Sequence, residues 1–178
     1  KSEIGGKGWV KIETNYLMRV PLDPVVRKGA VKLLDGLQCT FQLTGPDEIR
    51  AGKVKALVER CAPRDLYDVD RLLQSGELFL DTKMRSLIVA FLSTISTASV
   101  DVRGVTLKEI AWPDQTALKN ELLPVLKAGA KPDLNGMRTR VEAFLKSLFT
   151  FTADERQFLD KVAAGDVQGR LLFPTDAA

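Results

Sequence analysis

The stretch TGPDEIRAGKVKALVERCAPRDLYDVDRLL, residues 44–73, decides the fold because it predicts two consecutive helices joined by a short turn. Thr44 with Asp47 three residues later resembles a capping box that carries Asp in place of Glu, and Pro46 fits a first helical turn. The first helix should therefore run to about Arg60 and stop before the next proline. The second should span 65–73 and end at the Ser-Gly pair that follows.

The sequence on either side of this stretch differs in its periodicity. Alternating apolar and polar residues predict strands over 9–16 and 37–43. Downstream, apolar residues at helical spacing predict a core helix over 82–95, a short helix over 107–111, a kinked helix over 118–126 and a helix after Asp133. Thr152 with Glu155 is a full capping box for a last helix. A β-rich start followed by a helical body predicts an α+β fold.

Composition excludes several functional classes. The chain has 178 residues, 45% of them hydrophobic, and a formal net charge of +3 with both signs interleaved along the sequence. Its longest apolar run falls well short of the roughly 20 residues that a transmembrane helix needs. The absence of histidine removes the Ser/His/Asp triad, Cys/His catalysis and His-bearing zinc sites. Cys39 and Cys61 lie in separate predicted elements, which argues against a disulfide framework and favours a reducing cytoplasm.

Two cations fall inside the apolar face of the first predicted helix. On a helical wheel, Lys53 and Arg60 lie within the arc formed by residues such as Val54 and Leu57. One interpretation is that both side chains snorkel to the edge of the core. The other is that both point into a cleft that holds phosphate.

The second predicted helix carries acids on its apolar face. Asp65 falls between Val69 and Leu72, and Asp68 borders the same face. Asp65 is either an acid in the first turn, where it faces the helix dipole, or the partner of Lys53 or Arg60 in a charge-assisted hydrogen bond. Both alternatives remain open on the sequence.

Glu13 is a third candidate, because it stands on the polar face of the first predicted strand. A single Glu there usually faces solvent. It would hold Mg²⁺ only with two further carboxylates on neighbouring strands, and the sequence does not identify them.

The run EIRAGKVKALVER (48–60), followed by PRDLYD (63–68), resembles the AbiEii family of nucleotidyltransferase toxins. That family carries a Lys-x-x-Ala-x-x-x-Arg helix and then an Arg-Asp-x-x-Asp segment, and FTADERQFL (151–159) is similar to its C-terminal helix. The resemblance implies a partial polymerase-β-like nucleotidyltransferase sheet over 1–44 and a helical C-terminal domain over 45–178. It also implies the toxin of a bacterial toxin-antitoxin or phage-abortive system, acting in the cytoplasm and paired with an antitoxin. The reaction implied is transfer of nucleotide from a nucleoside triphosphate to an RNA acceptor, such as tRNA, with Mg²⁺.

The resemblance also assigns roles to the candidate residues. Lys53 matches the lysine expected near the nucleotide phosphates, and Asp65 matches the aspartate of the last motif, so both are expected to be catalytic. Arg60 and Asp68 match the same motif pair and are expected to position the nucleotide. Glu13 matches the third carboxylate on the core strand and is expected to bind the metal.

The start of the chain departs from the family pattern. A Gly-Ser type turn and an Asp-x-Asp metal pair should precede Glu13, whereas the segment from Gly5 to Gly8 fits a hairpin turn and lacks that pair. We therefore expect the metal-binding part to lie upstream of this sequence and the polypeptide alone to be inactive. The alternative is a non-catalytic helical module that binds RNA or a partner protein.

Overall fold

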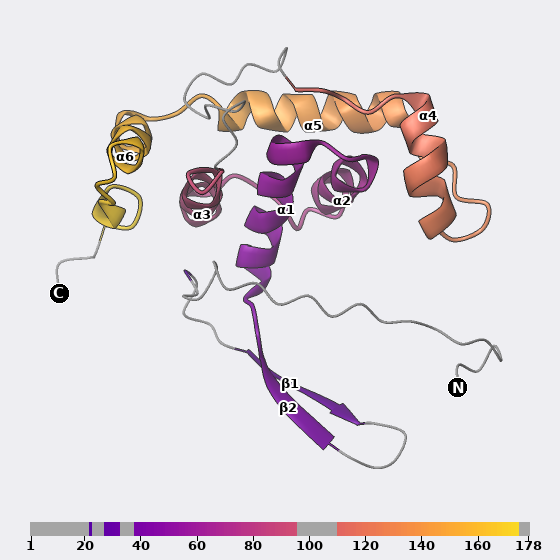
Figure 1. Ribbon diagram of the computed structural model, residues 1–178, viewed down its shortest axis with the longest axis horizontal. Coiled ribbons are helices and arrows are strands. Elements are labelled where there is room, and N and C mark those ends of the chain that lie inside the picture. Colours follow the sequence, from indigo (N-terminus) through magenta and orange to yellow (C-terminus); the bar gives the residue numbers. More distant parts are fainter. Residues whose placement is uncertain (1–21, 23–26, 33–37, 96–109, 175–178) are drawn as a thin grey trace.

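The computed structural model describes residues 22, 27–32, 38–95 and 110–174, and these residues are mostly helical (Figure 1). The elements in chain order are β1 (Arg27–Lys32), β2 (Gln38–Leu43), α1 (Pro46–Arg60), α2 (Pro63–Gln74), α3 (Thr82–Leu92), α4 (Gln115–Ala117), η1 (Leu118–Leu122), η2 (Leu123–Val125), α5 (Leu134–Leu148), α6 (Ala153–Ala163) and η3 (Gly169–Leu171). Within the described ranges no helix is long and apolar enough to cross a bilayer.

The predicted α+β class, with a partial polymerase-β-like sheet at the N-terminus, is wrong: the fold is mostly α. Strand structure in the described part of the chain is confined to the antiparallel pair β1–β2, in which Arg27 is opposite Leu43. The alternation over 37–43 located β2, but an alternating strand does not reveal how many strands pair beside it. The strand predicted over 9–16 lies outside the described residues, and the division at residue 44 stays a prediction.

The core is built where α1, α2, α3 and α5 meet. As predicted, α3 is the central core helix, and its residues Leu87, Ile88, Val89 and Leu92 are at most 1% exposed. Helix α1 packs against both α2 and α3, and α5 packs against α2. In Figure 1, α5 lies across the upper end of α1, above α2 and α3, which are seen nearly end-on. The buried face of α5, which includes Met137, Val141 and Leu145, is the predicted one.

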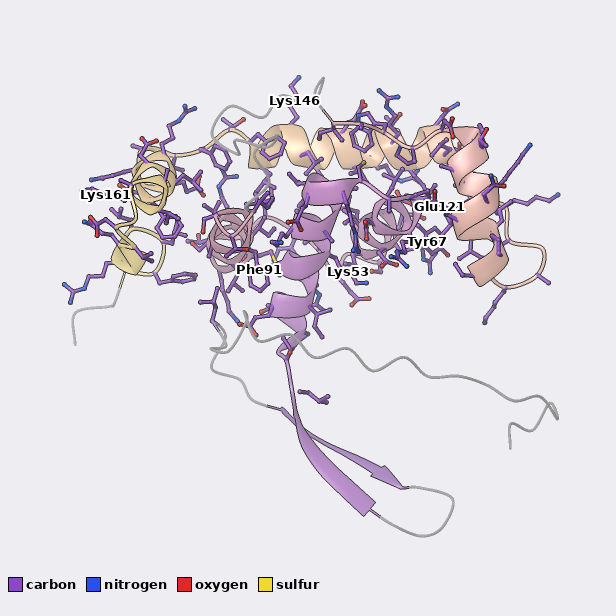
Figure 2. All side chains as sticks on the ribbon, viewed as in Figure 1. Lys53, Tyr67, Phe91, Glu121, Lys146 and Lys161 are labelled. Carbon is purple, nitrogen blue, oxygen red and sulfur yellow. The ribbon has the colours of Figure 1, made fainter. Side chains whose placement is uncertain are left out.

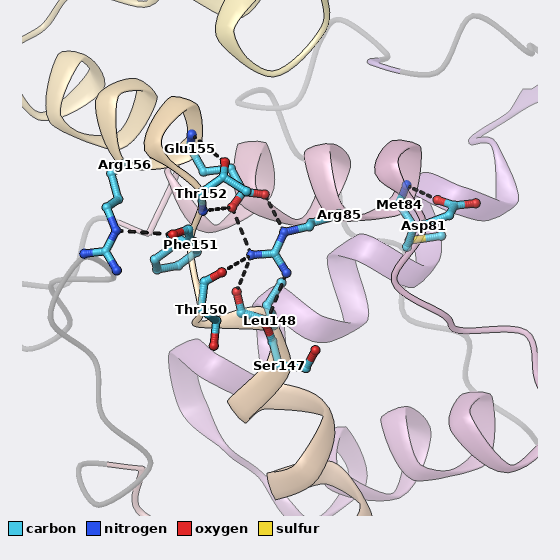
Figure 3. A network of polar contacts seen from close by, with 10 residues as sticks. All are labelled: Asp81, Met84, Arg85, Ser147, Leu148, Thr150, Phe151, Thr152, Glu155 and Arg156. Carbon is cyan, nitrogen blue, oxygen red and sulfur yellow. Dashed lines mark hydrogen bonds and ion pairs between the residues drawn. The ribbon is translucent and has the colours of Figure 1, made fainter.

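A single arginine of α3 joins the ends of α5 and α6 (Figure 3). Arg85 donates to both carboxylate oxygens of Glu155, at 2.6 and 2.9 Å, and to the backbone oxygens of Leu148 and Thr150, at 2.9 and 2.8 Å. Glu155 also accepts from the backbone N–H of Thr152, which confirms the capping box predicted for α6. The arginine therefore supplies donors to carbonyls that the end of α5 leaves unpaired.

The helix predicted over 118–126 is irregular, as its proline suggested. A short α-helical turn passes through a π-helical turn, η1, into the 3-10 turn η2 that contains Pro124. Of the short helix predicted over 107–111, residues 107–109 lie outside the described residues, and Ile110 and Ala111 are not helical.

Candidate functional site

A groove of about 330 Å³ lies between α1 and α2. Each helix lines it with a stripe of residues spaced i, i+3, i+4 and i+7, because that spacing returns to one face of an α-helix. The lining residues are Pro46, Ile49, Arg50 and Lys53 from α1, Asp68, Arg71 and Leu72 from α2, and Ser75 and Glu77 just beyond it. One wall of the groove is thus partly apolar, and the rest carries charges of both signs.

Lys53 and Asp68 form an ion pair within this groove. The Lys53 Nζ atom lies 2.7 Å from Asp68 Oδ2, and the side chains are 44% and 37% exposed. Figure 2 labels Lys53 on α1, from which its side chain reaches α2. Because both groups remain accessible to solvent, a ligand that enters the groove can reach them. Lys53 therefore lines a groove, and the interpretation that this groove holds phosphate stays a prediction.

Arg60 and Asp65 form a second ion pair, which is much more buried on its acidic side. Arg60 donates from Nε and Nη2 to the two oxygens of Asp65, at 2.7 and 2.8 Å. Asp65 is 2% exposed, whereas Arg60 is 53% exposed. The hydrogen bond to Asp65 raises the pKa of Arg60 above its usual value. This pair joins the last turn of α1 to the first turn of α2.

Asp65 also accepts from the backbone N–H of Ala62, at 3.3 Å, so it caps α2 as well as pairing with Arg60. Both sequence alternatives for Asp65 are therefore realised together. Among the described contacts, however, its partner is Arg60 and not Lys53, and Asp65 does not line the groove. The structure brings the four motif residues together as two separate pairs, and their catalytic and binding roles stay predictions.

Two further arginines, Arg50 and Arg71, line the groove and were not predicted from the sequence. Arg50 donates to Asp47 at 2.8 Å and to Glu77 at 3.2 Å, which holds it against the groove wall. The Arg71 side chain is exposed and has no hydrogen bond or ion pair with any described residue. The signal was present in the sequence, because Arg50 lies three residues before Lys53 and Arg71 lies three residues after Asp68.

The described residues do not provide a metal site. No group of three or more His, Cys, Asp or Glu side chains lies close enough to hold an ion in that part of the chain. Asp65 and Asp68 each face a basic side chain. Glu13, which is expected from the sequence to bind Mg²⁺, lies outside the described residues, and its role as a metal ligand stays a prediction.

Three cations and two acids line the groove, so an anion that enters it would meet a basic side chain. The oxygens of a phosphate compete well for lysine and arginine, since they accept charge-assisted hydrogen bonds as a carboxylate does. A phosphate beside Lys53 would replace the Asp68 carboxylate as the anionic partner of the ammonium group, so this group would not be left unpaired.

Comparison with known proteins identifies one family. The family model described as Nucleotidyl transferase AbiEii toxin, Type IV TA system, matches residues 2–164, which is most of the chain. No curated protein and no solved structure matches the sequence in the corresponding comparisons.

Proposed function

This chain belongs to the AbiEii family of nucleotidyltransferase toxins from type IV toxin-antitoxin systems, and on that premise we propose that its α1–α2 groove binds the phosphates of a nucleoside triphosphate. The nucleotide is then transferred to an RNA acceptor, such as tRNA. Mg²⁺ as cofactor, an antitoxin as partner and a cytoplasmic location belong to the same proposal. Each follows from the family and not from the groove.

The observation that carries this proposal is the position of Lys53. Its ammonium group stands in the groove, 2.7 Å from a carboxylate that is itself 37% exposed. An ion pair open to solvent contributes little to stability, typically about 0–1 kcal/mol, so its two members can separate at small cost. Lys53 can therefore leave the Asp68 carboxylate and neutralise the charge of a bound phosphate.

Arg60 and Asp65 support the groove from one end. Their bidentate pair fixes the turn between α1 and α2, and the same turn sets the distance between the two stripes that line the groove. Asp65, expected from sequence to be catalytic, acts in this proposal by holding α2 in place. Asp68, three residues later, faces Lys53 directly.

The test compares Lys53 with a lysine on the same helix that does not line the groove. Lys55 pairs with Glu59 on α1 at 2.7 Å and serves as the matched control. The protein is expressed from its native gene as wild type, Lys53→Ala and Lys55→Ala. Binding of each of the four nucleoside triphosphates is measured by calorimetry with Mg²⁺, and transfer is measured with labelled nucleotide and total tRNA.

We expect Lys53→Ala to weaken nucleotide binding at least tenfold and to abolish transfer, while Lys55→Ala behaves as wild type in both assays. Equal activity in the two variants would remove Lys53 from the site. A wild-type protein that binds RNA but no nucleotide would overturn the transferase proposal in favour of a non-catalytic binding module.

A further inference from the structure

The three cations that line the groove differ in what they already contact. Arg50 is held between Asp47 and Glu77 and is 22% exposed. Lys53 has Asp68 as its partner. The Arg71 side chain is exposed, lines the groove, and has no polar partner within the described part of the chain. Of these three side chains, Arg71 is therefore the one that can bind an incoming anion without giving up a contact.

Arg71 stands next to the Lys53–Asp68 pair. It follows Asp68 by three residues on α2, which places the two side chains on the same face, about one turn apart. A guanidinium group can donate two parallel hydrogen bonds to a phosphate, and it stays charged at every physiological pH. A polyphosphate bound to Arg71 would thus have its remaining phosphates in reach of the Lys53 ammonium.

Asp68 has the opposite relation to an anion in this groove. Its carboxylate occupies the Lys53 ammonium, and its negative charge repels a phosphate that approaches the same nitrogen. The exposure of the pair lets Asp68 turn toward solvent when it is displaced, so the exchange does not leave a buried charge.

We propose that Arg71 captures the phosphate chain of the nucleotide and that this chain then displaces Asp68 from Lys53. The inference rests on the proposed function, which it deepens by naming the residue that makes first contact and the carboxylate that competes. Arg71 is a phosphate-binding residue, and Asp68 limits the affinity of the groove for phosphate. The ligand class is a linear polyphosphate, whether free or carried by a nucleoside.

A structural role for Arg71 predicts a different result. Arg71 lies in the last turn of α2, where a cation interacts favourably with the helix dipole. That role requires only charge at the helix end, so Arg71→Lys would preserve it. Phosphate capture by a two-pronged donor would be weakened by the same substitution, because lysine cannot reproduce the geometry of guanidinium.

The experiment titrates inorganic tripolyphosphate and a nucleoside triphosphate into the full protein by calorimetry. The variants are Arg71→Gln, Arg71→Lys, Asp68→Asn and Lys53→Gln. Arg170→Gln is the matched control, because Arg170 is also exposed, lies on η3 and does not line the groove. Thermal unfolding of each variant shows that the fold is retained.

We expect Arg71→Gln to weaken tripolyphosphate binding about tenfold and Arg71→Lys to weaken it by several fold, with Arg170→Gln within twofold of wild type. Asp68→Asn should instead strengthen binding by several fold, because the competitor of the phosphate for Lys53 is gone. Affinities for Arg71→Gln and Arg170→Gln that agree would overturn the inference. So would an Asp68→Asn variant that binds as weakly as Lys53→Gln.

The outcomes for this inference and for the proposed function can be told apart. If Lys53→Gln loses nucleotide binding while Arg71→Gln keeps it, the proposed function stands and the role of Arg71 falls. If tripolyphosphate binding depends on Arg71 but no nucleotide reaches RNA, the inference about the groove stands and the transferase proposal falls. A wild-type protein that binds neither ligand overturns both.

Discussion

Replacement of Asp65 by alanine should destabilise the protein far more than replacement of Lys53, although the motif treats both as catalytic. Asp65 is 2% exposed and accepts three hydrogen bonds, two from Arg60 and one from the N–H of Ala62. Lys53 is 44% exposed and makes one ion pair with a partner that is also open to solvent. The two substitutions therefore remove contacts of very different kinds.

The magnitude follows from those contacts. A hydrogen bond to a charged group contributes about 1.5–3 kcal/mol, and loss of the capping interaction with Ala62 adds about 1 kcal/mol. Because Arg60 is 53% exposed, water can solvate it once Asp65 is gone, and this reduces the penalty for an unpaired charge. We expect Asp65→Ala to cost about 2–4 kcal/mol. Lys53→Ala should cost less than about 1 kcal/mol.

Urea unfolding of Asp65→Ala, Lys53→Ala, Arg60→Ala and the Arg60/Asp65 double variant measures this difference. The double variant isolates the coupling between the two side chains, which should be about 1–2 kcal/mol because one partner is buried. A free energy of unfolding for Asp65→Ala within 0.5 kcal/mol of wild type, taken as roughly the accuracy of such cycles, would refute the assignment of Asp65 to the α1–α2 turn. Loss of activity in a stable Asp65→Ala protein would return this residue to a direct catalytic role.

Three further predictions concern residues away from the groove. Glu155→Gln weakens the contacts from Arg85 and should lower the free energy of unfolding, measured with urea, by about 2 kcal/mol. The control Glu142→Gln weakens an exposed pair with Arg138 and should lower it by less than about 0.5 kcal/mol. Equal losses would contradict the role of the Arg85–Glu155 contacts. Burial raises the pKa of the Cys61 thiol from 9.0 to about 12, so a disulfide reagent at pH 8 should label this thiol in a Cys39→Ser variant only after unfolding. The free energy of unfolding should also fall between pH 9.0 and about 12, because the thiol ionises at lower pH in the unfolded chain than in the folded protein. Rapid labelling of the native protein would refute this prediction. Gly52→Ala should raise the free energy of unfolding by about 0.5–1 kcal/mol, because alanine favours the helix and the added methyl group lies 3.6 Å from the Phe91 ring. A less stable variant would show that this contact with Phe91 is too tight.

Local signals predicted most of the helical part of the fold, although α1 begins at Gly45 as N-cap and lacks the predicted Thr44–Asp47 capping box. The proline near the start of α1, the buried stripe of α3 and the Thr152–Glu155 capping box each act within a few residues, so the sequence alone reveals them. The fold class was wrong because strand alternation describes one strand, whereas a sheet depends on partners that are distant in sequence. The hairpin β1–β2 satisfies the same alternation without any larger sheet.

The sequence located four charged residues on the first two helices but not how they pair, and their functional roles stay predictions. Lys53, Arg60, Asp65 and Asp68 were found as charges on apolar helical faces, and the structure gives each of them a partner. Which cation meets which acid was not predictable, because it depends on the angle between α1 and α2. Arg50 and Arg71 were missed, although their spacing places them on the same helical faces as Lys53 and Asp68, because only the packing of α1 against α2 makes those faces the walls of a groove.

The spacing of the motif residues explains why Asp65 is buried whereas Asp68 is partly exposed to solvent. Lys53 and Arg60 are seven residues apart, about two helical turns, so both point from α1 toward α2 but at different heights. Asp65 stands in the first turn of α2, where Arg60 and the chain turn cover it, and Asp68 stands one turn further, where the groove has opened. Loss of Asp65 therefore loosens the turn that holds Asp68 opposite Lys53, and it can abolish activity without Asp65 touching a substrate. The activity of an Asp65 variant consequently measures catalysis only after correction for its folded fraction, whereas the activity of a Lys53 variant can be interpreted directly.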